Sequence, residues 1–346
     1  MVFAFCLESV APSPPVPELV EGLPLSHAIL VIGDLILDEY LIGQATRLSR
    51  EAAVPVLERT RRQLIAGGAA NPAVGVVALG GKATLAGVLG DDEGAQALCQ
   101  LLKERAIGTD GLLRDPSRPT TTKTRIVAEG GFVYVQHLAR IDHLDRHPLD
   151  SEIEQELIDK IRALVTAYDV ILVSDYKNGV VTPTLVEALD RLRHKTGIPL
   201  VVDSQGDLER FKGFDLVKCN RAEAESFLGM KIAVGDETAR RAALKALHER
   251  IAARALVVTL GSEGMAWQDG SGYGECRAPR AEVYDVTGAG DTVIAVLALA
   301  YAADLPLTEA CHLATHAAAL TVRVMGNYAP TWPELVQQIQ NTSTRD

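Results

Sequence analysis

Short apolar stretches alternate along the chain with longer segments in which apolar residues recur every three or four positions. The short stretches are nearly continuous in Val, Ile and Leu, which is typical of strands buried on both faces of a sheet. They lie at residues 28–34, 82–91, 169–175, 198–204, 216–220 and 255–261. Amphipathic segments of helical period lie at 91–106, 151–165 and 182–197. This alternation predicts an α/β fold with three layers, in which a mostly parallel sheet carries helices on both faces.

Two segments interrupt this rhythm. Residues 40–68 are rich in β-branched and charged residues, and residues 120–142 alternate like a hairpin around Gly130 and Gly131. We expect them to form a small lid of β-strands, over about 37–65 and 119–142, above the carboxyl edge of the main sheet. The lid would belong to a single domain spanning 26–340. Residues 1–25 are proline-rich and lack a basic start, which predicts a poorly ordered extension and not a signal peptide.

Composition narrows the class of protein. The chain has 346 residues, of which 47% are hydrophobic, and a formal net charge of −11, with no basic run longer than Arg59–Arg62. These values argue against a nucleic-acid partner. The five cysteines form no C-x-x-C pair, which argues against a zinc site and fits a cytoplasmic protein. The apolar run at 292–303 is too short to span a membrane and predicts a buried helix.

Several predicted strands end in a polar residue. In doubly wound sheets, ligands bind beyond the carboxyl ends of the parallel strands. The polar strand ends are Asp34, Asp175, Asp203, Asn220 and Thr259. Each therefore lies where a binding site is expected.

The turn DVTGAGD (285–291) runs directly into the apolar segment at 292–303. Gly288, Ala289 and Gly290 leave backbone N–H groups unobstructed at the start of the predicted helix, an arrangement that binds anions. Asp291 has two interpretations. It caps the helix, or it acts as a general base that removes a proton from an attacking hydroxyl while the N–H groups stabilise a transferring phosphoryl group.

The stretch GGAAN (67–71) predicts a helix start, with Asn71 at the N-cap and Pro72 as the first helical residue. Gly67 and Gly68 also permit close approach of the backbone to a ligand. The glycines and the Asn71 amide are therefore candidates for contact with a polyhydroxylated ligand.

The stretch CNRAE (219–223) places Asn220 at the end of a strand and Glu223 in the first turn of the next helix. An amide and a carboxylate at this corner would organise magnesium-bound water and phosphate oxygens. A capping box, with Asn at the N-cap and Glu at N3, explains the same spacing.

Other nucleotide and metal motifs are missing. The glycines before Lys82 have the wrong spacing for a Walker A motif, and no G-x-G-x-x-G follows a strand, so a dinucleotide-dependent oxidoreductase is not supported. His312 and His316 lie four apart without the glutamate of an H-E-x-x-H site, and we expect them to be structural.

Taken in order, GGAAN, NRAE and DVTGAGDT resemble the PfkB/ribokinase family of carbohydrate kinases, over about residues 29–335. The resemblance implies a ribokinase-like fold and transfer of the γ-phosphate of ATP, with Mg2+, to a sugar hydroxyl. It implies that Asp291 is the catalytic base, that Gly288, Ala289 and Gly290 form the anion hole, and that Asn220 and Glu223 act on magnesium and phosphate.

The same resemblance implies the remaining site residues. For the nucleotide they are Thr259, Gly261, Gly264 and Thr287, with the helix at 310–324. For the sugar they are Asp34, Asp38, Gly67, Gly68, Asn71, Asp142 and Asp175. Asp285 and Val286 match a loop that often holds a monovalent cation such as K+ in the family. Dimers that pair through lid strands occur in that family, and free lid edges favour such pairing here.

Within the family, the chain is most similar to the heptose-7-phosphate kinases of ADP-heptose synthesis. The matching stretches are residues 33–58, SDYKNGV (174–180) and residues 282–298. This implies D-glycero-D-manno-heptose 7-phosphate as substrate, phosphorylated at its anomeric hydroxyl, by a stand-alone kinase. Two departures concern the sugar: DSQG at 203–206 replaces DPKG and loses a lysine, and Arg50 replaces a proline.

Basic lid residues are candidates to receive a substrate phosphate, although a solvated lid surface explains each of them singly. They are Arg47, Arg50, Lys123 and Arg125. The alternatives are a ribose, fructose or nucleoside kinase of the same family and, in another class, a sugar-sensing protein that kept the fold without catalysis.

Overall fold

A nine-stranded sheet forms the centre of the molecule. The computed structural model describes residues 26–129 and 136–343. The strand order is β13-β12-β11-β10-β9-β8-β1-β4-β5, parallel from β11 to β5 and antiparallel from β11 to β13. The strands are β1 (Ala28–Gly33), β4 (Lys82–Leu89), β5 (Gly108–Arg114), β8 (Val170–Asp175), β9 (Leu200–Ser204), β10 (Leu216–Asn220), β11 (Ala255–Thr259), β12 (Met265–Asp269) and β13 (Gly272–Cys276). The predicted α/β fold with a mostly parallel sheet is confirmed.

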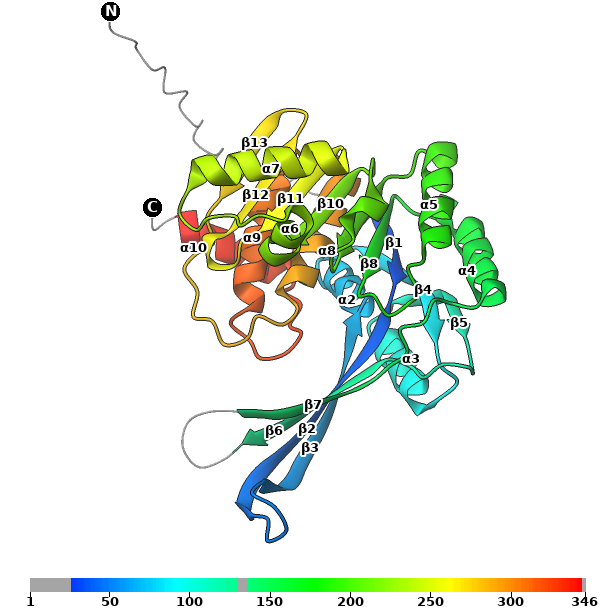
Figure 1. Cartoon of the computed structure of the whole chain (residues 1–346), viewed down its shortest axis with the longest axis vertical. Coiled ribbons are helices and arrows are strands. Elements are labelled where there is room, and N and C mark those ends of the chain that lie inside the picture. The colour runs from blue at the N-terminus through cyan, green and yellow to red at the C-terminus, as the bar shows by residue number, and fades with distance from the viewer. Residues whose placement is uncertain (1–25, 130–135, 344–346) are drawn as a thin grey trace, which may run out of the picture.

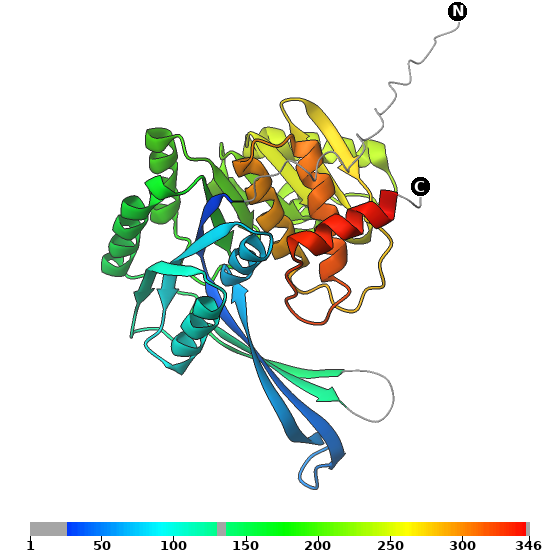
Figure 2. The ribbon, with the colours of Figure 1, turned by 180° about the vertical axis from the view of Figure 1, so that it is seen from behind.

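Helices cover both faces of this sheet, as predicted (Figures 1 and 2). One face carries α2 (Ala70–Ala78), α3 (Glu93–Glu104), α8 (Ala289–Ala302), α9 (Leu307–Thr321) and α10 (Trp332–Ser343). The other carries α4 (Ser151–Leu164), α5 (Pro183–Thr196), α6 (Arg221–Leu228) and α7 (Glu237–Ile251). Successive strand residues enter opposite cores, since Ile29 packs with the first set and Leu30 with the second.

Three strands of the sheet were not predicted. β5, β12 and β13 lie at or next to the sheet edges, where one side of a strand faces solvent or a loop. Their sequences, GTDGLLR, MAWQD and GYGEC, mix glycines and polar residues with few apolar ones. They therefore lack the continuous apolar run that identified the central strands.

A second sheet projects from the body as a lid (Figure 1). Its order is β3-β2-β6-β7, with β2 (Leu35–Leu48), β3 (Pro55–Gly68), β6 (Thr122–Glu129) and β7 (Gln136–His143). β2 pairs antiparallel with β3 and parallel with β6, and β6 pairs antiparallel with β7. The expected lid ranges were 37–65 and 119–142. The hairpin tip at Gly130 and Gly131 lies outside the described residues, as does the extension at 1–25.

One helix start differs from the prediction. Asn71 was expected to be an N-cap, but α2 begins at Ala70, Ala69 is the N-cap, and no side chain caps the helix. The Asn71 amide instead reaches Asp291, 220 residues away along the chain. Across 26–129 and 136–343, no helix combines the length and the apolar character needed to cross a membrane.

Candidate active site

Asp291 lies in the first turn of α8 and is 8% exposed. It does not cap the helix, because each carboxylate oxygen accepts a hydrogen bond from another element. The Asn71 amide donates to Oδ2 at 2.7 Å, and the Tyr176 hydroxyl donates to Oδ1 at 2.7 Å. Burial, together with the nearby Asp203 carboxylate, raises the pKa of Asp291 to about 6. The group is therefore mostly ionised at neutral pH and still basic enough to accept a proton.

The start of α8 presents backbone N–H groups beside this carboxylate. Gly288 is the N-cap and has a positive φ of 80°, a conformation that favours glycine. A Cβ at Gly288 would lie 3.0 Å from the Asn71 amide nitrogen, and a Cβ at Gly290 would lie 3.0 Å from Nζ of Lys218. Side chains at these positions would therefore crowd the groups that surround the helix N-terminus. The Ala289 N–H already donates to the Val286 carbonyl at 3.3 Å. The helix dipole and the N–H groups that follow Ala289 make this turn a suitable anion site.

A buried ion pair lies against the same turn. Nζ of Lys218 is 2.7 Å from Oδ2 of Asp203, and Lys218 is 5% exposed. The Asp203 carboxylate raises the pKa of Lys218 against the effect of burial, so the ammonium stays charged. Sequence reasoning passed over Lys218, which looked like an ordinary strand position between Val217 and Cys219.

A second lysine reaches the strand ends from another loop. Nζ of Lys177 would lie 3.0 Å from a Cβ at Gly206. Its charge lowers the pKa of Glu223, although burial, the largest effect, raises that pKa overall. Lys177 and Lys218 thus bring positive charge to the region where the DSQG stretch lacks a lysine.

Asn220 and Glu223 form the capping box that the spacing allowed. The Glu223 N–H donates to Oδ1 of Asn220 at 2.9 Å, and the Asn220 N–H donates to Oε2 of Glu223 at 2.7 Å. Oε1 of Glu223 forms no hydrogen bond within the described residues. The capping role therefore leaves one carboxylate oxygen for a cation or its water.

Asp34, which was expected to contact the sugar, lies where the loop after β8 meets the end of β1. It is 1% exposed and accepts three backbone N–H bonds, from Tyr176 and Asn178 at Oδ2 and from Val180 at Oδ1. Burial raises its pKa to about 6. The carboxylate holds the loop after β8 in place, which accounts for its polar contacts.

Asp175, also expected at the sugar, lies in a similar position. Its Oδ1 accepts the Lys177 N–H at 2.9 Å, and its Oδ2 accepts the Ser204 hydroxyl at 2.9 Å. The side chain is 2% exposed. It joins the loops after β8 and β9.

Asp38 lies at the base of the lid, where three elements meet. Its Oδ1 accepts from Arg125 on β6 at 2.5 Å, and its Oδ2 accepts from Asn327, on the loop after α9, at 3.1 Å. A Cβ at Gly67 would lie 2.1 Å from Oδ2, so only glycine fits beside this carboxylate. Gly68 has a φ of 57° and allows the chain to turn into α2.

One face of the lid gathers basic side chains. Lys123 pairs in register with Asp38 and with Asp142, and Arg125 pairs with Tyr40 and with Arg140. Directly opposed residues share a face of the sheet, so these six side chains form two adjacent rows, which we call the lid cation face. Arg140 and Asp142 also form an ion pair, with 2.9 Å between Nε and Oδ1.

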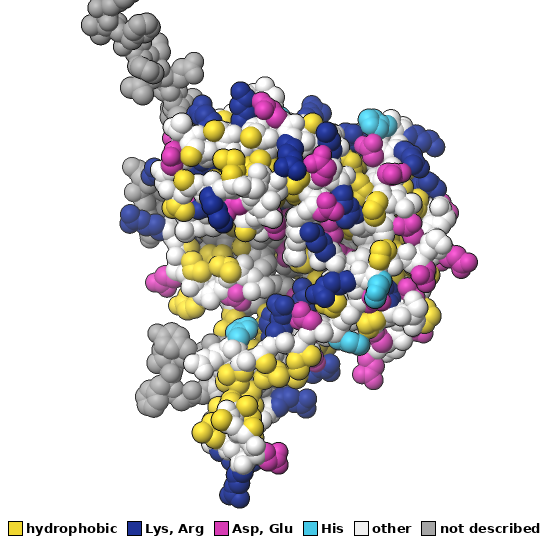
Figure 3. All heavy atoms as spheres, in the orientation of Figure 1, with side chains coloured by type: hydrophobic (Ala, Val, Ile, Leu, Met, Phe, Trp, Pro, Cys, Tyr) yellow, Lys and Arg dark blue, Asp and Glu magenta, His cyan; other side chains and the backbone are white. Residues whose placement is uncertain are grey.

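Lys123 connects the lid cation face to the body. Its ammonium lies 5.4 Å from the centre of the Tyr176 ring. Burial lowers the pKa of Lys123 despite the nearby Asp38, so its charge is incompletely compensated. Basic side chains are visible where the lid meets the body, whereas hydrophobic ones gather further along the lid (Figure 3). Arg47 and Arg50 lie at the distal end of β2 and beyond it, away from this junction.

A cavity of about 500 Å³ adjoins the start of α8 on the other side. It is lined by the expected residues Thr259, Gly261, Gly264 and Val286, by Ala289 and Gly290, and by α9 residues including Thr315, Ala318 and Ala319. Small and apolar side chains next to an anion site suit a nucleotide whose base lies in the cavity and whose phosphates reach the helix N-terminus.

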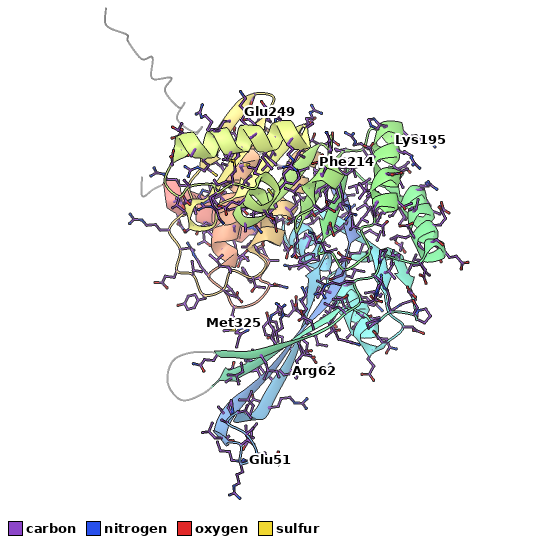
Figure 4. All side chains as sticks on the ribbon, in the orientation of Figure 1. Glu51, Arg62, Lys195, Phe214, Glu249 and Met325 are labelled. Atoms are coloured by element: carbon purple, nitrogen blue, oxygen red, sulfur yellow. The ribbon has the colours of Figure 1, made fainter. Side chains whose placement is uncertain are left out.

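Asp285 joins the loop before α8, which lines this cavity, to the loop after α9. Its Oδ1 accepts from the backbone and hydroxyl of Thr287, and its Oδ2 accepts the Gly326 N–H at 2.9 Å. Met325, next to Gly326 in the chain, lies on the side of the body nearest the lid, and Arg62 projects from the lid (Figure 4). His316, which was expected to be structural, is partly buried on α9, and this burial lowers its pKa to about 4.

Comparisons with known proteins agree with this geometry. The profile of the pfkB family carbohydrate kinases matches residues 26–335. The chain is 38% identical over 313 residues to the bifunctional protein HldE of Trichlorobacter lovleyi and 40% identical over 310 residues to that of Geobacter metallireducens. These alignments cover 90% and 89% of this chain but only 62% of each relative, so the chain spans less than two thirds of their length.

Solved structures share the fold. Phosphofructokinase-2 from Escherichia coli in complex with potassium superposes with a TM-score of 0.75 at 20% identity, covering 92% of this chain and 99% of that one. Ribokinase from Arabidopsis thaliana, complexed with ribose and ATP, superposes with a TM-score of 0.68 at 19% identity, covering 91% and 99%.

Proposed function

Because the chain belongs to the pfkB family of carbohydrate kinases, we propose that Asp291 is the base that activates a sugar hydroxyl for attack on the γ-phosphate of ATP. The observation that carries this assignment is the pair of hydrogen bonds that hold a buried, ionised carboxylate beside the N-terminus of α8. A carboxylate next to a phosphate site is unfavourable unless it takes part in the reaction, and here it does not cap the helix.

Different groups of the chain would bind the nucleotide, stabilise the transferring phosphoryl group and accept the proton. The cavity at α9 would hold the base of ATP, and the N–H groups of the Gly288–Asp291 turn would hold the transferring phosphoryl group. The ammonium of Lys218, and that of Lys177 further out, offset negative charge at the same place. Asp291 accepts the proton of the attacking hydroxyl.

Magnesium fits the corner formed by Asn220 and Glu223. Burial raises the pKa of Glu223, which marks a carboxylate short of positive partners, and its Oε1 is unused within the described residues. Magnesium would neutralise charge on the phosphates of ATP there. Within 26–129 and 136–343, no three His, Cys, Asp or Glu side chains cluster as metal ligands, which suits an ion carried with the nucleotide.

For the acceptor, we infer D-glycero-D-manno-heptose 7-phosphate, phosphorylated at its anomeric hydroxyl. The sequence resemblance to heptose-7-phosphate kinases supports this choice, and so does the lid cation face. Its three cations, Lys123, Arg125 and Arg140, face two carboxylates, Asp38 and Asp142, so a phosphate would complete the charge balance. A neutral ribose or fructose would leave that charge uncompensated.

A substrate panel tests the activity and the acceptor together. ADP formation is measured with ATP, Mg2+ and K+ against D-glycero-D-manno-heptose 7-phosphate, the unphosphorylated heptose, ribose, fructose and adenosine. We expect turnover to be highest with the heptose phosphate. A preference for a neutral sugar would remove the heptose assignment and keep the kinase, and the absence of turnover with every sugar would favour a sugar-sensing protein.

Two further properties follow from the same family. We expect K+ to raise activity, because Asp285 lies in the loop that the resemblance associates with a monovalent cation and bonds it to the loop after α9. We also expect a homodimer through the lid, whose distal residues Leu48 and Val54 are 70% and 52% exposed. Replacing K+ with Na+ in the assay tests the first, and sedimentation velocity of the wild type against Leu48→Lys tests the second.

A further inference from the structure

Tyr176 donates a hydrogen bond to Asp291 and lies outside both the GGAAN and the DVTGAGDT stretches. It follows β8, in the SDYKNGV stretch, and its hydroxyl donates to Oδ1 of Asp291 at 2.7 Å. Burial, with the negative charge of Asp291 next to it, raises the pKa of Tyr176 well above its usual value, so the hydroxyl keeps its proton and stays a donor.

The loop that carries Tyr176 is held unusually firmly. Its N–H groups at Tyr176, Asn178 and Val180 all donate to the Asp34 carboxylate, and Lys177 adopts a positive φ of 59°. A non-glycine residue in this conformation is strained, and the surrounding hydrogen bonds must offset that strain. The Asp34 carboxylate thus holds the loop in place, and the loop places the Tyr176 hydroxyl against Asp291.

We propose that Tyr176 is a positioning residue for phosphoryl transfer, whose hydroxyl fixes the Asp291 carboxylate in the orientation that accepts the proton. The proposal rests on the assignment of Asp291 as base. Asn71 holds Oδ2 and Tyr176 holds Oδ1, so the carboxylate cannot rotate without losing both bonds. Each oxygen keeps a further lone pair for the sugar hydroxyl.

The same residue links the base to the lid. Lys123 of the lid cation face lies 5.4 Å from the centre of the Tyr176 ring, and a cation at this distance is attracted to the ring face. Tyr176 is therefore in contact with the lid on one side and with the base on the other. A substrate held by the lid cation face would lie close to the tyrosine that orients the base.

The test is Tyr176→Phe, which keeps the ring and its contact with Lys123 and removes only the hydroxyl. Loss of a hydrogen bond to a buried carboxylate should lower kcat about tenfold at pH 6.5, with KM for heptose 7-phosphate within about twofold. The hydrogen bond from Tyr176 lowers the pKa of Asp291, so its loss should raise that pKa above about 6. The acid limb of the kcat profile should then move to higher pH, and activity should partly recover at pH 8.

Tyr301→Phe is the matched control. Tyr301 is a partly buried tyrosine at the other end of α8, roughly 15 Å along the helix from Asp291. We expect it to leave kcat and the pH profile unchanged. Thermal unfolding of both variants reports any general loss of stability.

A carboxyl 13C NMR titration of Asp291 needs no substrate and separates this proposal from the proposed function. An upward shift of the Asp291 pKa in Tyr176→Phe supports the positioning role even if every sugar fails in the assay. An unchanged pKa together with an unchanged kcat would overturn the proposal. So would a lower KM at unchanged kcat, because Tyr176 would then merely occupy the place of the sugar hydroxyl.

Discussion

The edge of the main sheet and the lid cation face differ in how their charged side chains are paired. At the sheet edge, the Asp291 carboxylate accepts two hydrogen bonds, and Lys218 forms an ion pair with Asp203, all within the body of the protein. On the lid cation face, no ion pair joins Lys123 to a carboxylate among the described residues, and three cations lie with two carboxylates. On the proposed function, the groups at the sheet edge carry out the chemistry, and the lid cation face binds the phosphate of the substrate.

The two regions meet through very few polar contacts. Asn327 donates to Asp38, and Lys123 lies over Tyr176. Chemistry and recognition should consequently be separable by mutation. Substitutions at the sheet edge should act on kcat or stability with any sugar, and substitutions on the lid should act on KM in a way that depends on the phosphate of the sugar.

The largest effect is expected for Asp291→Asn, which keeps the shape and removes the base. We expect kcat to fall by about 10³-fold or more, towards the upper end of general-base contributions. Isothermal titration should show sugar binding within a few-fold of wild type. A variant with near wild-type turnover would contradict the assignment of Asp291 as the base.

Lys218→Met tests the sheet edge through stability. Removing one partner of a buried ion pair leaves Asp203 uncompensated and should cost about 3–5 kcal/mol in the free energy of unfolding. The measurement is urea denaturation. The double variant Lys218→Met/Asp203→Leu should recover most of the stability, and its activity reports whether the ammonium also serves phosphoryl transfer.

Arg125→Gln tests the lid. Loss of a charge-assisted contact to the substrate phosphate should lower kcat/KM for heptose 7-phosphate roughly 10- to 100-fold, mainly through KM. Activity with unphosphorylated heptose should change much less. Arg62→Gln is the control, because Arg62 is also on the lid but pairs with Glu39 and is about half exposed. Equal losses on both sugars would show that Arg125 only supports the lid through Asp38.

The pH dependence should reflect the sheet edge alone. Asp291 has a raised pKa of about 6, so the base is ionised above this pH and protonated below it. We expect kcat to be level near pH 7–8 and to fall up to tenfold for each unit below about pH 6. Rates measured from pH 5 to 8, with the Arg125→Gln variant in parallel, should give the same limb for both proteins.

The smallest effect is expected for Asn327→Ala, which cuts the contact between the lid base and the loop after α9. We expect KM for the sugar to rise only a few-fold, because one neutral hydrogen bond to a carboxylate is lost while Arg125 still pairs with Asp38. Steady-state kinetics measure this. A loss as large as that of Arg125→Gln would mean that the two regions are coupled more tightly than their contacts indicate.

Sequence patterns predicted the central strands because those strands are buried on both faces and read as unbroken apolar runs. They could not predict β5, β12 and β13, whose edge positions remove that signal. The motif around Asp291 pointed to an anion site beside an acid. Local spacing could not show that the Asn71 side chain donates to Asp291 and does not cap α2, because that contact joins residues 220 positions apart.

The same limit applies to the supporting residues. Asp34 ends a strand at the edge where ligands bind, so a sugar contact was the natural expectation. That expectation remains a prediction, and the local pattern did not indicate that Asp34 also accepts hydrogen bonds from three N–H groups of a loop more than 140 residues away. Tyr176 lies in the SDYKNGV stretch but was assigned no role, Lys218 lies in no motif that was singled out for it, and only the folded arrangement places both next to Asp291.

The bond between Asn71 and Asp291 also has a consequence for biosynthesis. At typical translation rates of roughly 5–20 residues per second, the 220 residues between its partners take on the order of 10–40 s to synthesise. During that interval the growing chain already carries the Asn71 turn and later the loop anchored by Asp34, but not Asp291. On the proposed assignment of Asp291 as the base, the nascent chain turns over no ATP until residue 291 has been synthesised.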